Sequence, residues 1–263
     1  MVIGVFFLAH WALAVFVQSF FLHRYSAHRY FSMSRGWERF FHFLTFVAQN
    51  ASYLNPRAYG ILHRMHHAYS DTPSDPHTPT EYGNPLSMMW NTKNVYTAVY
   101  RREFPVEPRF ETAYPSWPML EGIGDAWVTR IGWMALTTLF YVQFATSPWL
   151  FLLLPVHWLM GPLHGAIVNW CGHKYGYQNF DNGDESRNTL PMDFLIGGEL
   201  FQNNHHKYSG RVNFAYRRFE VDPVYWVVRG LAFFRVLKLN RAEVPKVSTP
   251  TSASVPGEGT CVV

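Results

Sequence analysis

The sequence predicts an all-α fold: a polytopic membrane domain of helices, with about three spans and several interfacial helices, covered on the cytosolic side by a histidine-rich cap. Three observations predict it. Hydrophobic residues make up 48% of the chain and charged residues only 15%, against about 25% in an average soluble domain. Several apolar runs are long enough to cross a bilayer. Groups of histidines follow the ends of those runs.

Charge and cysteine content narrow the classes of protein that fit. The formal net charge is +4, and four arginines follow the first apolar run, as is typical of the cytoplasmic flank of a span. They are Arg24, Arg29, Arg35 and Arg39. No long basic run with interleaved aromatic residues appears, which argues against nucleic-acid binding. With two cysteines, Cys171 and Cys261, the chain is not expected to carry a disulfide framework.

The first apolar run covers residues 2–22, about the length that a bilayer requires. A signal peptide is the competing interpretation, but no basic segment precedes the run and no small-residue cleavage site precedes Arg24. The positive flank therefore places residue 23 onward in the cytoplasm and Met1 outside. We expect His10, within the run, to be a packed or interfacial residue and not a ligand.

His23 and His28 follow this run in an HxxxxH pattern. Five residues rotate a regular α-helix by about 500°, which leaves the two rings about 140° apart. The pattern is therefore compatible with two different metal ions, or with one ion if the regular helix ends there.

Residues 63–67 form an HxxHH pattern, in which positions i, i+3 and i+4 share one helix face. Three imidazoles on one face favour a divalent transition metal as their partner. Before this helix, residues 37–60 predict a helix at or partly within the membrane and then a turn, with His42 at the interface. After it, residues 68–125 predict a loop-rich soluble cap with short helices. We expect His77 there to support ligands or fix its loop, with direct ligation as the alternative.

Two further apolar runs, residues 126–146 and 148–168, predict a hairpin of spans that returns the chain to the cytoplasm. Within the second, His157 and His164 are expected to be hydrogen-bonded core histidines. The return leads to Asn169-Trp-Cys-Gly-His173 and then to Gln202-Asn-Asn-His205-His206, which repeats HxxHH with glutamine in the first place.

The C-terminal part predicts one more helix and a tail. Residues 222–240 read as an amphipathic interfacial helix. Its expected apolar side chains are Trp226, Val227, Leu231, Phe234 and Leu237, opposite Arg229, Arg235 and Lys238. Residues 241–263 are expected to form a disordered tail, so the folded domain is predicted to cover residues 1–240.

Eight histidines are expected on one side of the membrane. They are His23, His28, His63, His66, His67, His173, His205 and His206. Eight imidazoles exceed the needs of one tetrahedral zinc, and no HExxH motif supplies a general base. Two ions of a redox metal that handles dioxygen, meaning iron, fit a nitrogen-rich site beside an apolar membrane. Unrelated surface histidines are the alternative, and three boxes with matching topology argue against it.

The motifs resemble those of the membrane fatty-acyl desaturases, in particular the Δ9-type branch that includes stearoyl-CoA desaturase. The resemblance extends from about His23 to His206. It rests on HRYSAH, on HRMHHAYSDTPSDPH, on NWCGH, and on GDESRN followed by GGELFQNNHH.

The resemblance implies a cytosolic cap holding a non-haem di-iron centre, with the eight histidines as iron ligands and Asn169 acting through water. It implies removal of two hydrogens from adjacent methylenes of an acyl chain, with dioxygen and two electrons, to give a cis double bond near mid-chain. The substrate would be an acyl-CoA or an acyl-lipid. The chain contains no HPGG-type haem signature, so the electrons are expected from a separate ferredoxin- or cytochrome-type donor with its reductase.

Two departures from the family pattern qualify this expectation. The third box usually opens with histidine, and Gln202 is a weaker donor, which leaves the regiochemistry and the iron potential open. The family normally has two spans before the first box and this sequence has one, so either Met1 lies outside the membrane or the sequence begins late.

The sequence therefore predicts an integral membrane di-iron acyl desaturase whose site faces the cytoplasm, in the inner membrane of a bacterium or the endoplasmic reticulum of a eukaryote. A related di-iron hydroxylase or ketolase acting on a lipid is the alternative among enzymes. A non-catalytic membrane protein that binds metal is the alternative from another class.

Overall fold

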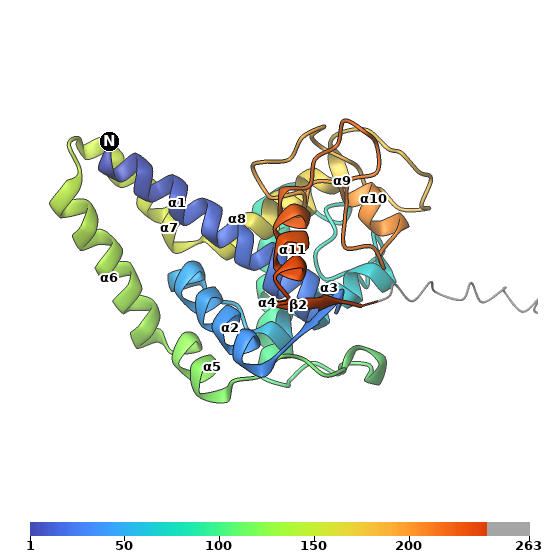
Figure 1. Ribbon diagram of the computed structural model, residues 1–263, viewed down its shortest axis with the longest axis horizontal. Coiled ribbons are helices and arrows are strands. Elements are labelled where there is room, and N and C mark those ends of the chain that lie inside the picture. The colour runs from blue at the N-terminus through green and yellow to red at the C-terminus, as the bar shows by residue number, and fades with distance from the viewer. Residues whose placement is uncertain (241–263) are drawn as a thin grey trace, which may run out of the picture.

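The structure is a computed structural model and describes residues 1–240. It is mainly helical, and its two three-residue strands, β1 (Phe31–Met33) and β2 (Leu237–Leu239), pair antiparallel with Phe31 opposite Leu239. Long helices extend to one side of the molecule, and the loop-rich part around the short helices α9 and α10 lies on the other (Figure 1). The expected tail, residues 241–263 with Cys261, lies outside the described residues.

The first apolar run is helical, as predicted. Helix α1 (Val2–Val17) continues without a break into the π-helix η1 (Gln18–Ala27). Together they form a 26-residue helix with a mean hydropathy of 1.9 over its most apolar window. Its C-terminal end is buried from Gln18 to Ala27, so the helix carries His23 directly into the core of the protein.

Two helices follow the first box and lead to the second. Helix α2 (Arg35–Gln49) begins at the Ser34 cap and is followed by a 3-10 turn, η2 (Asn50–Ser52). Helix α3 (Pro56–Tyr69) contains the HxxHH pattern, as predicted. It starts where it does because the Asn55 side chain accepts hydrogen bonds from two backbone N–H groups of the first turn, at 3.0 and 3.1 Å, and Pro56 suits the first helical position.

The predicted loop-rich cap is more helical than expected. It contains the 16-residue helix α4 (Pro85–Tyr100), the 3-10 turn η3 (Pro108–Phe110) and the helix α5 (Pro118–Asp125). Each of these elements has a proline in its first turn, which is the position where the missing N–H costs least.

The predicted hairpin of spans is only partly regular. The first arm is helix α6 (Trp127–Phe144). The second arm is a series of short elements: η4 (Pro148–Leu153), α7 (Leu154–Trp158), α8 (Met160–Ala166), the π-helix η5 (Ile167–Cys171) and α9 (Gly172–Lys174). It bends by 76° between Trp158 and Met160.

The number of spans stays a prediction. Among the described residues, one helix is long and apolar enough to cross a membrane, Val2–Ala27, or two if the bent pair Pro148–Trp158 and Met160–Lys174 is taken as one span. The expected second span, residues 126–146, is helix α6 in the structure and does not meet that test of length and apolarity.

The predicted interfacial helix over residues 222–240 is wrong in its second half. Helix α10 (Gln202–Lys207) is followed by α11 (Pro223–Phe233), which ends early, and the chain then turns at Arg235 with φ 59° and forms β2. Val224 and Val228 point into the core, whereas Trp226, one of the apolar side chains expected at the interface, is 65% exposed.

The main core lies directly beneath the histidines. It joins η1, β1, α2 and α11, and its fully buried aromatic members include Phe20, Phe21, Phe31 and Phe201. Phe214 belongs to the same core, and its ring centroid lies 4.3 Å from that of His205. Packing of the core therefore fixes the backbone on which the histidines stand.

Candidate metal centre

The structure brings all eight predicted histidines together in two adjoining groups. Within each group the ring nitrogens lie within 4.8 Å of one another. The five-histidine cluster consists of His23, His28, His63, His67 and His205, and the three-histidine cluster consists of His66, His173 and His206. The clusters adjoin, since the ring centroids of His67 and His206 are 4.7 Å apart.

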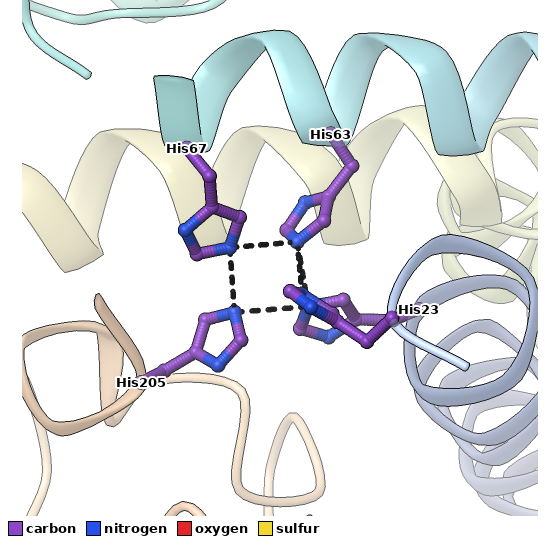
Figure 2. Close-up of side chains that lie close together, drawn as sticks. His23, His63, His67 and His205 are labelled. Carbon is purple, nitrogen blue, oxygen red and sulfur yellow. Dashed lines mark hydrogen bonds between the residues drawn. The ribbon is translucent and has the colours of Figure 1, made fainter. Parts of the chain in front are cut away.

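The rings of the five-histidine cluster point their Nε2 atoms toward a common centre, as Figure 2 shows for four of them. Neighbouring Nε2 atoms lie 2.9 Å apart for His23 and His63, 3.0 Å for His63 and His67, 2.9 Å for His67 and His205, and 3.2 Å for His205 and His23. Two nitrogens that bind one ion at about 2.1 Å and at right angles lie about 3.0 Å apart. The spacing therefore suits a transition metal with imidazole ligands.

The π-helix explains how His23 and His28 reach the same cluster. In η1 the backbone N–H of His28 donates to the carbonyl of His23, five residues back, at 3.0 Å. A π-helix holds about 4.4 residues per turn, so five residues return almost to the starting direction. Of the two possibilities that the HxxxxH spacing left open, the structure favours a single shared position.

Buried charges hold His23 in place. Its Nδ1 donates to Glu199, and the other oxygen of Glu199 accepts from Arg24 Nη1 at 2.6 Å. Arg24 is completely buried and also donates to Asp222 at 2.7 Å. Because Nδ1 of His23 carries the proton, its Nε2 presents a lone pair to the centre.

In the three-histidine cluster every ring donates its Nδ1–H to a carboxylate. The pairs are His66 with Asp75 at 2.8 Å, His173 with Asp71 at 2.9 Å and His206 with Asp184 at 2.7 Å. This arrangement is typical of metal-binding histidines, whose second nitrogen is fixed by a carboxylate that orients the ring.

The resulting lone pairs need a cation. His66 and His206 both give Nδ1–H to carboxylates, yet their Nε2 atoms face each other at 3.2 Å with no proton between them. Nε2 of His173 is buried and has no partner among the described residues. Facing lone pairs repel, and a bound metal ion converts the repulsion into two bonds. On this observation the residues fit a metal site.

The electrostatic surroundings keep these histidines in the neutral form that can bind a metal. Burial, and then the neighbouring histidines, lower the pKa of His28, His63, His66, His67 and His205 well below 6.5. Burial opposes ionisation of Asp71 and Asp184, but the hydrogen bonds from His173 and His206 outweigh it and the pKa of each carboxyl is lowered. These imidazoles are therefore neutral lone-pair donors, and these two carboxylates are ionised.

Asn169, Gln202 and His77 are predicted from the sequence to support the site or to be additional ligands. Asn169 lies in η5, and among the described residues no hydrogen bond links its side chain to either cluster. Gln202 donates its amide hydrogen to the Glu199 carbonyl at 2.7 Å and packs against Gly172 beside His173. His77 is buried beside the three-histidine cluster, with its ring centroid 4.5 Å from that of His66.

The other histidines lie outside both clusters. His10 and His157 join through their Nδ1 atoms at 2.6 Å, and His157 Nε2 accepts from Tyr141 at 2.8 Å, so His157 is a hydrogen-bonded core histidine as predicted. His164 is buried, but its ring nitrogens have no partner among the described residues, contrary to the expectation. His42 is buried and 2.8 Å from the Tyr53 hydroxyl, and it belongs to neither cluster.

Sequence reasoning missed the four carboxylates that orient the rings. None of the four belongs to a histidine motif, and none forms a pair of ligand carboxylates in the sequence, so neither pattern identifies them. They are Glu199, Asp71, Asp75 and Asp184. A usable signal was present, because each lies within a motif segment, GDESRN, GGEL or the SDTPSDPH that follows the second box.

Access to the three-histidine cluster lies on its solvent side. A cavity of about 360 Å³ is bordered by His173 and by charged and polar side chains, namely Thr80, Lys174, Tyr175, Glu185 and Arg187. His173 itself is only 2% exposed, so the ring forms part of the wall without standing free in solvent.

Comparison with known proteins gives a consistent picture. The family model described as "Fatty acid desaturase" matches residues 1–234. The acyl-CoA 5-desaturase AL21 of Anemone leveillei is 26% identical over 83% of this chain and 65% of its own length. A hex-5-enoyl-[acyl-carrier protein] acetylenase of Moorena producens is 26% identical (84% and 71%), and an sn-1 stearoyl-lipid 9-desaturase of Anabaena variabilis is 25% identical (86% and 79%). The chain thus spans roughly two thirds of the length of the first of these relatives.

Proposed function

This chain belongs to the fatty acid desaturase family, and we propose that it is an oxygen-dependent acyl desaturase that binds two iron ions through its eight clustered histidines. The observation that carries the proposal is the convergence of Nε2 atoms in both clusters. The spacing of 2.7–3.2 Å between neighbouring Nε2 atoms is that of ligands around an ion, and the facing lone pairs of His66 and His206 repel without one.

The two clusters would each hold one iron. When bound, the iron pair would supply the reduction of dioxygen to two waters, using two hydrogen atoms from adjacent methylenes together with two electrons and two protons from outside. The chain contributes a buried set of nitrogens, and carboxylates fix the tautomer of four of the eight rings. Glu199, Asp71, Asp75 and Asp184 keep the proton on Nδ1, so that Nε2 stays free for metal.

For the substrate we propose an acyl chain carried by CoA or by a lipid, with a cis double bond introduced at a Δ9-type position. The names of the relatives support this class, since they include an acyl-CoA desaturase and an acyl-lipid 9-desaturase. Electrons would come from a separate ferredoxin- or cytochrome-type donor with its reductase.

We place the enzyme in a membrane, with the iron site on the cytoplasmic side. The continuous helix Val2–Ala27 supports this placement. It is apolar through most of its length and ends with His23 and Arg24 buried at the cluster, so the span and the site share one rigid element.

The test compares the lipids of cells that express the intact chain, the His66→Ala variant and the His164→Ala variant. His66 belongs to the three-histidine cluster, whereas His164 is an equally buried histidine that belongs to neither. We expect gas chromatography with mass spectrometry to find a new monounsaturated acid with the intact chain and with His164→Ala, and none with His66→Ala. Wild-type product from His66→Ala would contradict the ligand assignment.

The same profile separates the neighbouring activities. One relative is an acetylenase, and an acid with a triple bond would move the assignment toward that activity. An oxygenated lipid without an unsaturated one would move it toward a hydroxylase or ketolase.

A further inference from the structure

The two clusters differ in their number of imidazoles, and residue 202 lies where a further one would be expected. Gln202 opens α10 and stands one turn before His205 and His206. Its amide nitrogen donates to the Glu199 carbonyl at 2.7 Å, and its stem packs against Gly172, where an added Cβ would meet Gln202 Cγ at 2.5 Å. The Gln202 amide nitrogen is therefore committed to the backbone, and the atom that the side chain could offer to a metal is its carbonyl oxygen, a weaker donor than an imidazole.

A ninth histidine, His77, lies beside the three-histidine cluster. It is 5% exposed, and neither ring nitrogen has a hydrogen-bond partner among the described residues. One nitrogen of His77 lies within 4.8 Å of a nitrogen of His66 and of an oxygen of Asp75. A neutral imidazole always carries one N–H and one lone pair, and leaving both buried and unpaired costs free energy.

The loop that contains His77 is organised by the carboxylates of the same cluster. The His77 backbone N–H donates to Asp75 Oδ1 at 3.0 Å, and the Thr78 hydroxyl donates to Asp71 Oδ1 at 2.8 Å. The other oxygens of these two carboxylates accept from the rings of His66 and His173. The backbone of His77 is thus tied to the site, while its ring is left without a partner.

We propose that His77 is a further iron ligand of this chain and completes the three-histidine cluster in place of an imidazole at position 202. This role rests on the proposed function, since it requires that the clusters hold iron. His66 uses Nδ1 for Asp75, so Nε2 is the atom it offers to an ion, and His77 shares that ion when its ring turns toward the same position. The buried nitrogens of His77 then gain the partner they lack.

The test measures metal binding and requires no turnover. The full chain, purified in detergent and freed of metal, is titrated with Co²⁺, whose visible absorption reports the number of ligands, and ions per chain are counted by mass spectrometry. The His77→Phe variant keeps a ring beside His66 and removes both nitrogens. We expect the wild type to bind two ions. In the variant, the ion of the five-histidine cluster should bind with unchanged affinity, and the second ion, that of the three-histidine cluster, at least about tenfold more weakly.

A rescue variant separates ligation from packing. Gln202→His, added to His77→Phe, places an imidazole on α10 one turn before His206. We expect the double variant to bind the second ion tightly again, because the cluster regains a fourth imidazole. The His164→Phe variant is the matched control, since His164 is also buried with two unpartnered ring nitrogens, and it should bind two ions as the wild type does.

The outcomes are distinguishable. Wild-type affinity for the second ion in His77→Phe overturns the ligand role of His77. A weakened second ion that Gln202→His does not restore also overturns it and assigns His77 to the packing of its loop. If the wild type binds neither Co²⁺ nor Fe²⁺, the proposed iron centre itself fails, whatever the variants show.

Discussion

The five-histidine cluster and the three-histidine cluster draw on the same two helices but hold their rings by different means. Helix α3 gives His63 and His67 to the first and His66 to the second, and α10 gives His205 to the first and His206 to the second. In the five-histidine cluster, among the described residues, one ring is tied to a carboxylate, and that carboxylate is itself neutralised by Arg24. In the three-histidine cluster each ring has a carboxylate of its own.

This difference indicates which part of the structure positions the rings of each cluster. The five-histidine cluster is positioned by helices, among them the π-helix η1, which packs on an aromatic core, so it depends on the fold as a whole. The three-histidine cluster is positioned by Asp71, Asp75 and Asp184, which stand on loops. We expect the first to be sensitive to changes in packing and the second to changes in local charge.

The largest effect is expected from His63→Ala. Nε2 of His63 lies within 2.7–3.0 Å of Nε2 of His23, His28 and His67, so its loss removes the ligand that touches most others. We expect activity to fall by more than about 100-fold, which exceeds the usual loss when a residue that only orients a ligand is removed. We also expect one iron per chain in place of two. Metal analysis with a turnover assay checks this. Loss of both ions would show that the clusters do not fill independently.

Arg24→Met tests the dependence of the five-histidine cluster on the fold. The substitution leaves Glu199 and Asp222 buried without their cation, which costs about 3–5 kcal/mol of unfolding free energy. Thermal unfolding in detergent measures it. Arg109→Gln is the control, because the pair of Arg109 with Glu107 is exposed, and its midpoint should not change measurably. An unchanged midpoint for Arg24→Met would show that the buried charges around the five-histidine cluster do not stabilise the fold.

Asp184→Asn tests the charge dependence of the three-histidine cluster. The amide still accepts a hydrogen bond from His206 Nδ1 but carries no charge, so the ring becomes a poorer donor. We expect the three-histidine cluster to bind its ion about 10–100-fold more weakly, with the affinity of the five-histidine cluster and the unfolding midpoint unchanged. Metal titration followed by calorimetry reports both. Equal weakening of both ions would mean that Asp184 serves the centre as a whole.

The smallest effect concerns pH and separates the fold from the metal. Burial lowers the pKa of His42, which lies outside both clusters, from 6.5 to about 4. Between pH 6.5 and about 4 the unfolded chain therefore binds a proton at His42 that the folded chain does not. The contribution of neutral His42 to the unfolding free energy is complete above pH 6.5 and is lost as the pH falls toward 4. The slope is at most about 1.4 kcal/mol per pH unit. We expect His42→Gln to flatten the dependence of unfolding free energy on pH in this window, and an unchanged slope would contradict the assignment.

Local patterns in the sequence predicted many of the histidines in the site. The HxxHH spacing places three rings on one face of α3, and the Asn55-Pro56 start is written in the same stretch. What the sequence could not show depends on distant contacts. Glu199 lies 176 residues from His23, and Asp71 lies 102 residues from His173, so no local period predicts that they meet.

Two elements departed from their local pattern for identifiable reasons. The apolar period over 222–240 continues past Phe233, but the pairing of β2 with β1 is a tertiary contact that overrides it. The winding of η1 is equally invisible, because the residues of a π-helix read as those of an α-helix.

The π-helix η1 has a consequence for how this segment can change over time. In ordinary α-winding the five residues from His23 to His28 would leave the two rings about 140° apart, so at this spacing the π-helix is what brings both rings to one cluster. Replacing a residue such as Leu22 alters packing but leaves the spacing intact. Removing one residue between the two histidines would instead suit ordinary winding, because four residues leave the rings about 40° apart in an α-helix. The length and the winding of this stretch are therefore coupled, whereas its side chains can change one at a time.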